Sequence, residues 1–185
     1  MTIFEKKKLE RDKFRKLRDE ISLNHRENVA KNVRLYVDTF FKEYKKIGYI
    51  AIYWPLNNEV DIRSLKEKIS LALPRCKDKK ELLFYPWDER PLTKDSEGIL
   101  SPNNSSLLSH KQISMILVPC LSVDKNLIRL GYGGGYFDKL RRDKNWRNVP
   151  CIGVLTSNCI STIPLTRAEW DIPLSGFITE KEIFV

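Results

Sequence analysis

Ten consecutive residues, Arg129 to Asp138 (RLGYGGGYFD), combine the groups best suited to binding phosphate. Four of the chain's eight glycines fall between positions 131 and 135. Because glycine has no Cβ and readily adopts positive φ, the amides of such a loop can approach phosphate oxygens closely. Arg129 adds a cation that can donate two parallel hydrogen bonds to phosphate, and Asp138 adds an oxygen ligand suited to Mg²⁺. The segment therefore predicts a nucleotide phosphate site.

Two common nucleotide-binding motifs do not fit this loop. A P-loop requires Lys followed by Ser or Thr after its last glycine, but Tyr136 and Phe137 stand there instead. A dinucleotide motif GxGxxG that began at Gly131 would require a glycine at position 136. Two simpler interpretations stay open. The glycines could form a flexible turn between a strand and a helix, and Asp138 could complement the dipole of that helix.

The cysteines and histidines do not support zinc chemistry. The chain has two histidines, His25 and His110, and four cysteines without a CxxC pair, which excludes the usual zinc spacings. Cys120 and Cys151 lie in or beside apolar segments, so we expect buried, reduced thiols.

The net charge of +9 comes mostly from residues 1–46, which hold 14 Lys and Arg against 8 Asp and Glu. Such a segment attracts nucleotides, polyanionic metabolites or nucleic acid. A non-catalytic nucleic-acid-binding module should also interleave basic and aromatic residues on one surface, and no such run is found. No apolar run approaches the ~20 residues of a membrane span, and the first residues do not form a secretory signal. We therefore expect a cytoplasmic protein that binds neither nucleic acid nor membrane.

Hydrophobic spacing predicts the elements that would position these residues. Phe14, Leu17 and Ile21 follow helical spacing up to a break or cap at Ser22, and a second helix carries apolar residues from Val33 to Tyr44. Strands are predicted at 47–53, 82–85, 113–118, 152–155 and 177–179, and short helices at 62–69, with Asp61 as cap, and at 136–142. Residues 70–74 fit either a helix end or a strand, and 88–109 indicates a long surface loop.

Strands that alternate with helices imply right-handed crossovers and a mostly parallel sheet. We expect one α/β domain over residues 1–185, with a basic helical segment at 1–46 and an α/β core at 47–185. The domain should have three layers, with a mostly parallel central sheet and helices on both faces. Ligands bind such sheets beyond the carboxyl ends of the strands, so residues 54–59 and 119–138 should form the site.

Further sequence patterns resemble those of a known enzyme family. Residues 118–124 (VPCLSVD) and the glycine loop correspond to the family pattern VPG-L-x-F-D, a spacer, and RLG-x-G-x-GYYD. Other matches span nearly the whole chain in the family's order: Lys7, Arg11, Arg18, Ile21, Ser22, Tyr53-Trp54-Pro55, Glu59-Val60-Asp61, Leu73-Pro74-Arg75, Phe84, Trp87, Gly98-Ile99, Pro102, Asp171-Ile172-Pro173-Leu174 and Thr179-Glu180. The chain thus resembles the 5-formyltetrahydrofolate cyclo-ligases, also called methenyltetrahydrofolate synthetases.

The resemblance implies a monomeric, Mg²⁺-dependent ligase that uses ATP as co-substrate and acts on 5-formyltetrahydrofolate, with or without a polyglutamate tail. The implied ATP site consists of Lys7, Arg11, Arg129, Gly131, Gly133, Gly134, Gly135, Tyr136 and Phe137. The implied folate contacts are Trp54, Glu59 and Tyr136, and the implied metal ligands are Asp138 and Asp171. Arg129 and Tyr136 are the implied catalytic residues.

Four positions depart from the family pattern. Cys120 replaces a glycine, Trp170 replaces a frequent histidine, Glu10 stands where leucine is usual, and Gly134 where many members carry lysine. Without the resemblance, Lys7 would be read as a solvated helix residue and Trp54 as a core residue. The sequence pattern also fits a member of the same family that acts on another N-formyl compound.

The family reaction suits this set of residues. The formyl carbonyl is a poor electrophile, and passing the γ-phosphoryl group of ATP to its oxygen creates a leaving group. The substrate's own N10 then attacks the activated carbon, so no side-chain nucleophile is required. The protein has to position the two substrates and neutralise phosphate charge. An aromatic ring such as Trp54 can stack on the pterin, while Glu59 accepts hydrogen bonds from its ring N–H groups.

Overall fold

Two amphipathic helices begin the chain. Helix α1 (Ile3–Asp19) starts at a capping box formed by Thr2 and Glu5. Helix α2 (Leu23–Glu43) starts at Ser22, whose side chain accepts a hydrogen bond from the amide of His25, which confirms the predicted cap. The buried face of α2 carries Val29, Val33 and Val37 at helical spacing. No helix in the part of the chain described below combines the length and apolar character needed to cross a membrane.

The computed structural model describes residues 1–44, 48–78, 81–103 and 106–185. The remaining strands and helices are β1 (Tyr49–Ala51), η1 (Arg63–Glu67), β2 (Leu71–Lys77), β3 (Glu81–Pro86), β4 (Thr93–Lys94), β5 (Leu100–Ser101), η3 (His110–Gln112), β6 (Ile113–Pro119), β7 (Ser122–Asp124), β8 (Arg129–Leu130), α3 (Tyr136–Leu140), α4 (Lys144–Arg147), β9 (Cys151–Val154), η4 (Ser157–Cys159), β10 (Ile160–Ser161), β11 (Gly176–Ile178) and β12 (Ile183–Phe184).

A seven-stranded sheet runs through the molecule in the order β12-β11-β9-β6-β1-β2-β3. The four pairs from β11 to β2 are parallel, and the outermost pair at each edge is antiparallel. The predicted α/β class with a mostly parallel central sheet is therefore confirmed.

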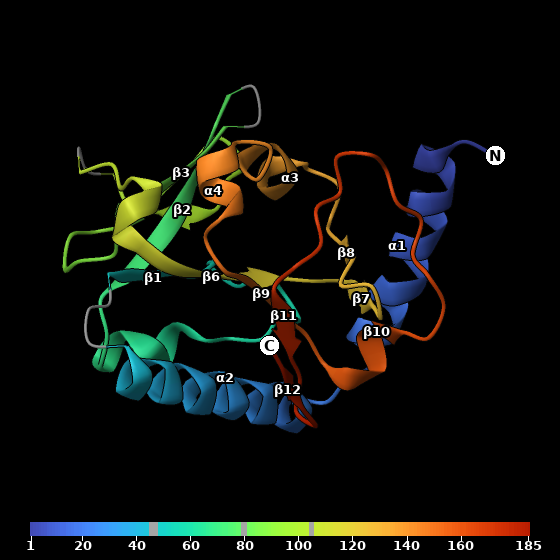
Figure 1. Cartoon of the computed structure of the whole chain (residues 1–185), viewed down its shortest axis with the longest axis horizontal. Coiled ribbons are helices and arrows are strands. Elements are labelled where there is room, and N and C mark those ends of the chain that lie inside the picture. Colours follow the sequence, from blue (N-terminus) through green and yellow to red (C-terminus); the bar gives the residue numbers. More distant parts are fainter. Residues whose placement is uncertain (45–47, 79–80, 104–105) are drawn as a thin grey trace.

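Alternating residues of the strands form a core on each side of the sheet. Ile50 and Ile52 pack toward α2 and η1, whereas Ala51 between them belongs to the opposite core. Figure 1 shows α2 below the sheet and α3 and α4 above it, so helices cover both faces, as predicted. The opposite core also takes up Phe14 of α1.

A small three-stranded sheet, β10-β7-β8, follows the end of β6 and was not predicted. Figure 1 places it beside α1. Buried Asp124 organises the turn that leads to Arg129. One of its carboxylate oxygens accepts hydrogen bonds from the amides of Asn126 and Ile128, and the other accepts one from the amide of Leu165. This turn delivers Arg129 to the carboxyl end of β6.

Several sequence predictions need correction. Residues 88–109 are not a plain loop, because strands β4 and β5 form a hairpin, which Arg75 binds through Thr93 and Ser101. The short helix after Asp61 is a 3₁₀ turn that begins after Ile62, and the Asp61 side chain accepts a hydrogen bond from the amide of Arg63 in place of a helix cap.

The ambiguous segment 70–74 belongs mostly to strand β2, which begins at Leu71. The first predicted strand is shorter than expected and spans residues 49–51. Its predicted first residue, Ile47, lies outside the described residues.

Candidate active site

The loops that follow β1 and β6 meet at a cavity of about 330 Å³. Tyr53, just after β1, and Pro119, the last residue of β6, both line it, so the cavity lies at the carboxyl ends of parallel strands. Each site residue predicted from the sequence lines this cavity: Lys7, Arg11, Trp54, Glu59, Arg129, Gly131, Gly133, Gly134, Gly135, Tyr136, Phe137, Asp138 and Asp171. The fold therefore brings the whole predicted set together, while the individual roles stay predictions.

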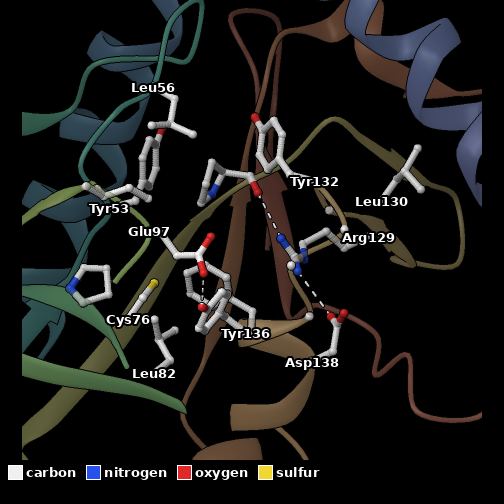
Figure 2. A pocket seen from close by; sticks show the side chains of 18 of the residues that line it. Tyr53, Leu56, Cys76, Leu82, Glu97, Arg129, Leu130, Tyr132, Tyr136 and Asp138 are labelled. Atoms are coloured by element: carbon white, nitrogen blue, oxygen red, sulfur yellow. Dashed lines mark hydrogen bonds and ion pairs between the residues drawn. The ribbon is translucent and has the colours of Figure 1, made fainter. Parts of the chain in front are cut away.

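Arg129 is the best-anchored cation of the cavity. Its guanidinium donates hydrogen bonds to the carbonyl of Pro119 at 3.2 Å and to Asp138 at 3.2 Å, and Figure 2 shows it pointing toward Asp138. Burial alone would lower the pKa of Arg129, but the carboxylate of Asp138 and the nearby thiols raise it above its usual value. The side chain is 10% exposed and remains charged.

The glycines make room for two arginines. A Cβ on Gly131 would lie 2.8 Å from Nη2 of Arg129, so any side chain there would displace the guanidinium. Gly133 has a φ of 107°, which other residues rarely adopt, and Arg11 lies over it. Nε of Arg11 donates a hydrogen bond to the carbonyl of Gly131 at 2.9 Å. Helix α3 has only five residues, so its dipole is weak, and Arg11 and Arg129 bring full positive charges to the loop.

Lys7 is buried and forms an ion pair with Asp171, whose carboxylate also accepts a hydrogen bond from the amide of Ala168 at 2.6 Å. The pair joins α1 to the loop before β11. The alternative of a solvated lysine is therefore wrong, because the side chain of Lys7 is only 11% exposed. An ATP phosphate near Lys7 would compete with Asp171 for its charge.

The two predicted metal ligands are hard oxygen donors that line the same cavity. Asp138 has a side chain that is 36% exposed, and one of its oxygens pairs with Arg129. Asp171 pairs through one oxygen with Lys7. No group of three or more potential metal-binding side chains occurs among residues 1–44, 48–78, 81–103 and 106–185. Mg²⁺ in nucleotide sites commonly has one or two carboxylate ligands, with phosphates and water completing its shell, so this donor pair fits such an ion.

Glu59 has an unusual environment for a carboxylate. One oxygen accepts a hydrogen bond from the amide of Leu56 at 2.7 Å, whereas buried Oε1 has no hydrogen-bond partner among the described residues. Burial raises the pKa of Glu59, while the Tyr132 hydroxyl, the Leu56 amide and Arg18 oppose that rise. A buried carboxylate oxygen without a donor is costly, which is the expected state of a group that receives its donors from a ligand.

Trp54 lines the cavity and is partly buried. Its ring makes an edge contact with Trp87 at a centroid distance of 5.9 Å, and the guanidinium of Arg63 lies 4.5 Å from its centroid. Trp54 is therefore held by two neighbours while still lining the cavity.

The β4–β5 hairpin supplies a wall that sequence reasoning missed. In Figure 2 the Tyr136 hydroxyl points at Glu97, to which it donates a hydrogen bond. This bond raises the pKa of Tyr136 to about 12, so the phenol stays protonated. Asp95 and Ile99 of the same hairpin also line the cavity. The matched Gly98-Ile99 pair was the only sequence signal that pointed to this segment.

Tyr132 is the second residue that sequence reasoning missed. It lies inside the glycine loop, and Figure 2 places its ring on the same side of the cavity as Leu56. Its hydroxyl accepts a hydrogen bond from Arg18 at 2.9 Å. Burial and the nearby Glu59 raise its pKa well above the usual value.

The fold and the cavity together define an α/β enzyme whose ligand site lies beyond the carboxyl ends of parallel strands. Comparison with known proteins makes this class specific. The model of the 5-formyltetrahydrofolate cyclo-ligase family matches residues 3–180, and the chain belongs to this family. It is a ligase, as predicted.

Similar proteins cover almost the whole chain. A Haemophilus influenzae protein named 5-formyltetrahydrofolate cyclo-ligase is 26% identical over 175 residues, which are 89% of this chain and 92% of the relative. The NMR structure of Aquifex aeolicus 5,10-methenyltetrahydrofolate synthetase has a TM-score of 0.76 and 27% identity, covering 96% of this chain and 91% of that one. The 5,10-methenyltetrahydrofolate synthetase of Mycoplasma pneumoniae has a TM-score of 0.72 at 22% identity, covering 94% and 98% of the two chains, and supports the fold alone.

Proposed function

We propose that the protein converts 5-formyltetrahydrofolate and ATP into 5,10-methenyltetrahydrofolate, ADP and phosphate. The observation that carries this proposal is the convergence of two unlike groups in one cavity. Glu59 offers a buried carboxylate oxygen without a partner, and Arg129 offers an anchored cation beside a glycine loop. The first suits a ligand rich in N–H donors and the second suits phosphate.

The reaction proceeds in two steps in this proposal. The formyl oxygen attacks the γ-phosphorus of ATP, the bond to the β-phosphate oxygen breaks, and ADP leaves. N10 then attacks the formyl carbon, the N10 proton is lost, and phosphate departs with the former formyl oxygen. The nucleophiles come from the substrates, so the protein contributes position and charge.

Arg129 and Arg11 stabilise the negative charge of the phosphates in this arrangement. Arg129 is already held by Pro119 and Asp138, so little reorganisation is required when charge develops. Glu59 orients the pterin, and the ring of Trp54, which lines the same cavity, contacts it. Tyr136 donates its one hydroxyl proton to Glu97, so its phenol oxygen is free to accept a hydrogen bond from a substrate N–H group.

Asp138 and Asp171 would hold Mg²⁺ that arrives with ATP. When bound, the ion supplies positive charge to the phosphate oxygens. Asp138 also holds Arg129, so one carboxylate links the metal-binding wall to the cation.

An assay for methenyl product tests the proposal directly. Mg·ATP and 5-formyltetrahydrofolate should produce the absorbance of the methenyl compound, and omission of either nucleotide or metal should prevent it. An N-formyl compound without a pterin, supplied under the same conditions, tests the alternative substrate. Turnover of that compound without turnover of the folate would reject the proposed substrate. The monomeric state and the cytoplasmic location stay predictions.

Replacing Asp138 by asparagine should raise the Mg²⁺ concentration needed for half-maximal nucleotide binding several-fold, because a neutral amide is a weaker ligand for a hard cation. Asp171→Asn should have a milder effect, since Asp171 is committed to Lys7. Asp143→Asn is a matched control, because Asp143 caps α4 and asparagine caps equally well. If Mg²⁺ titrations of both site variants coincide with the wild type, the two carboxylates do not belong to a metal site.

A further inference from the structure

Glu59 is surrounded by titratable and charged groups, and most of them are engaged elsewhere. Tyr53 donates its hydroxyl proton to the carbonyl of Val60 at 2.7 Å. Arg26 donates to the carbonyl of Ile21 at 2.8 Å, and Asp61 pairs with Arg63 at 2.6 Å.

The other groups near Glu59 also have partners of their own. Burial raises the pKa of the Cys120 thiol to about 12, so it stays neutral. Lys31 donates to Asn28, and Arg34 donates to the carbonyl of Ser64. Glu27, another acid in this surrounding shell, can only repel a second carboxylate.

Tyr132 differs from these neighbours because its hydroxyl interacts with the Glu59 carboxylate itself. Its hydroxyl accepts a hydrogen bond from Nη1 of Arg18 at 2.9 Å, and a phenol that accepts one bond still has its own O–H to donate. Tyr132 and Glu59 line the same cavity and the same small recess behind it, to which Arg18 also contributes. The Arg18 guanidinium lies 5.3 Å from the centre of the Tyr132 ring, so it contacts both the ring and its hydroxyl.

The acceptor for that proton is at hand. Oε1 of Glu59 is buried and has no partner among the described residues, and the Tyr132 hydroxyl lies beside the carboxylate without completing a full hydrogen bond to it. Each carboxylate oxygen has two lone pairs, so a bond from Tyr132 leaves capacity for a ligand N–H. A hydroxyl that accepts a bond from a cation is also a stronger donor.

We propose that Arg18 and Tyr132 are positioning residues for Glu59, in which Arg18 fixes and polarises the Tyr132 hydroxyl and that hydroxyl donates to the Glu59 carboxylate. This inference rests on the proposed function, because it gives Glu59 the task of binding the folate pterin. Arg18, which the sequence patterns matched without a role, then acts on the folate through two other side chains. The network keeps Glu59 charged and aimed although the carboxylate is removed from water.

Affinity for 5-formyltetrahydrofolate, measured against pH without ATP, tests this network. Folate binding that needs ionised Glu59 is lost as pH falls through the pKa of Glu59. Removing a donor to the carboxylate raises that pKa, so the loss should occur at higher pH. We expect the midpoint to rise by about one pH unit in Tyr132→Phe, with roughly fivefold weaker binding at the wild-type midpoint and a difference that approaches about tenfold at lower pH. The titration of the folate itself is common to all variants and does not affect the difference.

Further variants separate this role from a structural one. Arg18→Gln should shift the pH midpoint in the same direction as Tyr132→Phe. Arg18→Lys should cause a smaller shift, because it keeps one charged donor. Tyr49→Phe and Lys16→Gln are matched controls that lie away from the cavity and should leave the pH profile unchanged. In a Glu59→Gln background, Tyr132→Phe should cause little further loss of affinity.

The outcomes distinguish the two proposals. A wild-type protein that neither binds 5-formyltetrahydrofolate nor forms methenyl product would reject the proposed function itself. Suppose instead that the wild type binds the folate but Tyr132→Phe has the wild-type pH midpoint, or that the losses of folate affinity caused by Tyr132→Phe and Glu59→Gln add fully in the double variant. Either result would show that Tyr132 acts independently of Glu59, and only the network would be rejected.

Discussion

Arg129→Ala is expected to reduce turnover by about a hundredfold or more, the usual effect of removing a preorganised group that stabilises transition-state charge. Arg129 is held by the carbonyl of Pro119 and by Asp138, so its guanidinium is already in place before phosphate arrives. Arg129→Lys should recover only part of the activity, because an ammonium cannot keep both anchoring contacts and still bind phosphate with two bonds.

Turnover under saturating substrates and the thermal midpoint of unfolding should be measured together. Asp138 is partly exposed and can be solvated when its partner is removed, so a moderate loss of stability is expected. Arg142→Ala is a suitable control, because Arg142 follows the same short helix and is exposed over Trp170. Unchanged turnover and unchanged ATP dependence in Arg129→Ala would show that Arg129 is only structural.

Glu59→Gln should weaken binding of 5-formyltetrahydrofolate by roughly 1.5–3 kcal/mol, the range for hydrogen bonds to a charged group. Glutamine keeps the size and the contact with the Leu56 amide but loses the charge. Affinity for ATP, measured without folate, should hardly change, because Arg129 and the glycine loop remain intact.

Isothermal titration of each ligand separates these effects. Because burial raises the pKa of Glu59, wild-type folate affinity should also fall at a higher pH than for an ordinary glutamate, and this dependence should vanish in the variant. If Glu59→Gln loses affinity for ATP but retains affinity for 5-formyltetrahydrofolate, the assignment of Glu59 to folate binding is contradicted.

The parts of the fold that the sequence predicted are the long and periodic ones. Helix α2 carries buried valines at positions 29, 33 and 37, and β6 is apolar from Met115 to Val118, so each has a clear signature. The small sheet and the β4–β5 hairpin consist of two- and three-residue strands, which are too short to show any alternation. Tertiary contacts, such as those of Asp124 with Leu165 and of Arg75 with Ser101, decide their conformation.

The candidate site was predictable where residue types are diagnostic. Four clustered glycines and Arg129 indicate phosphate chemistry on their own, and the order of further motifs extends the site to Glu59 and Asp171. Tyr132 and Glu97 were not predicted, because nothing local separates a functional aromatic or acid from one that merely faces solvent. Their positions opposite Glu59 and Tyr136 come from chain folding alone.

The ion pair between Lys7 and Asp171 joins residues that are 164 positions apart in the chain. The neighbouring contact of Glu10 with Thr166 spans a similar separation. A ribosome adds roughly 5–20 residues per second, so on the order of ten seconds or longer passes between the synthesis of α1 and the synthesis of Thr166 and Asp171. Throughout that interval Lys7 lacks the carboxylate with which it pairs in the folded protein, and the cavity lacks the lining residue Asp171. Nascent chains that stop before Asp171 therefore cannot assemble the site, and binding competence arrives only after Asp171 has been synthesised.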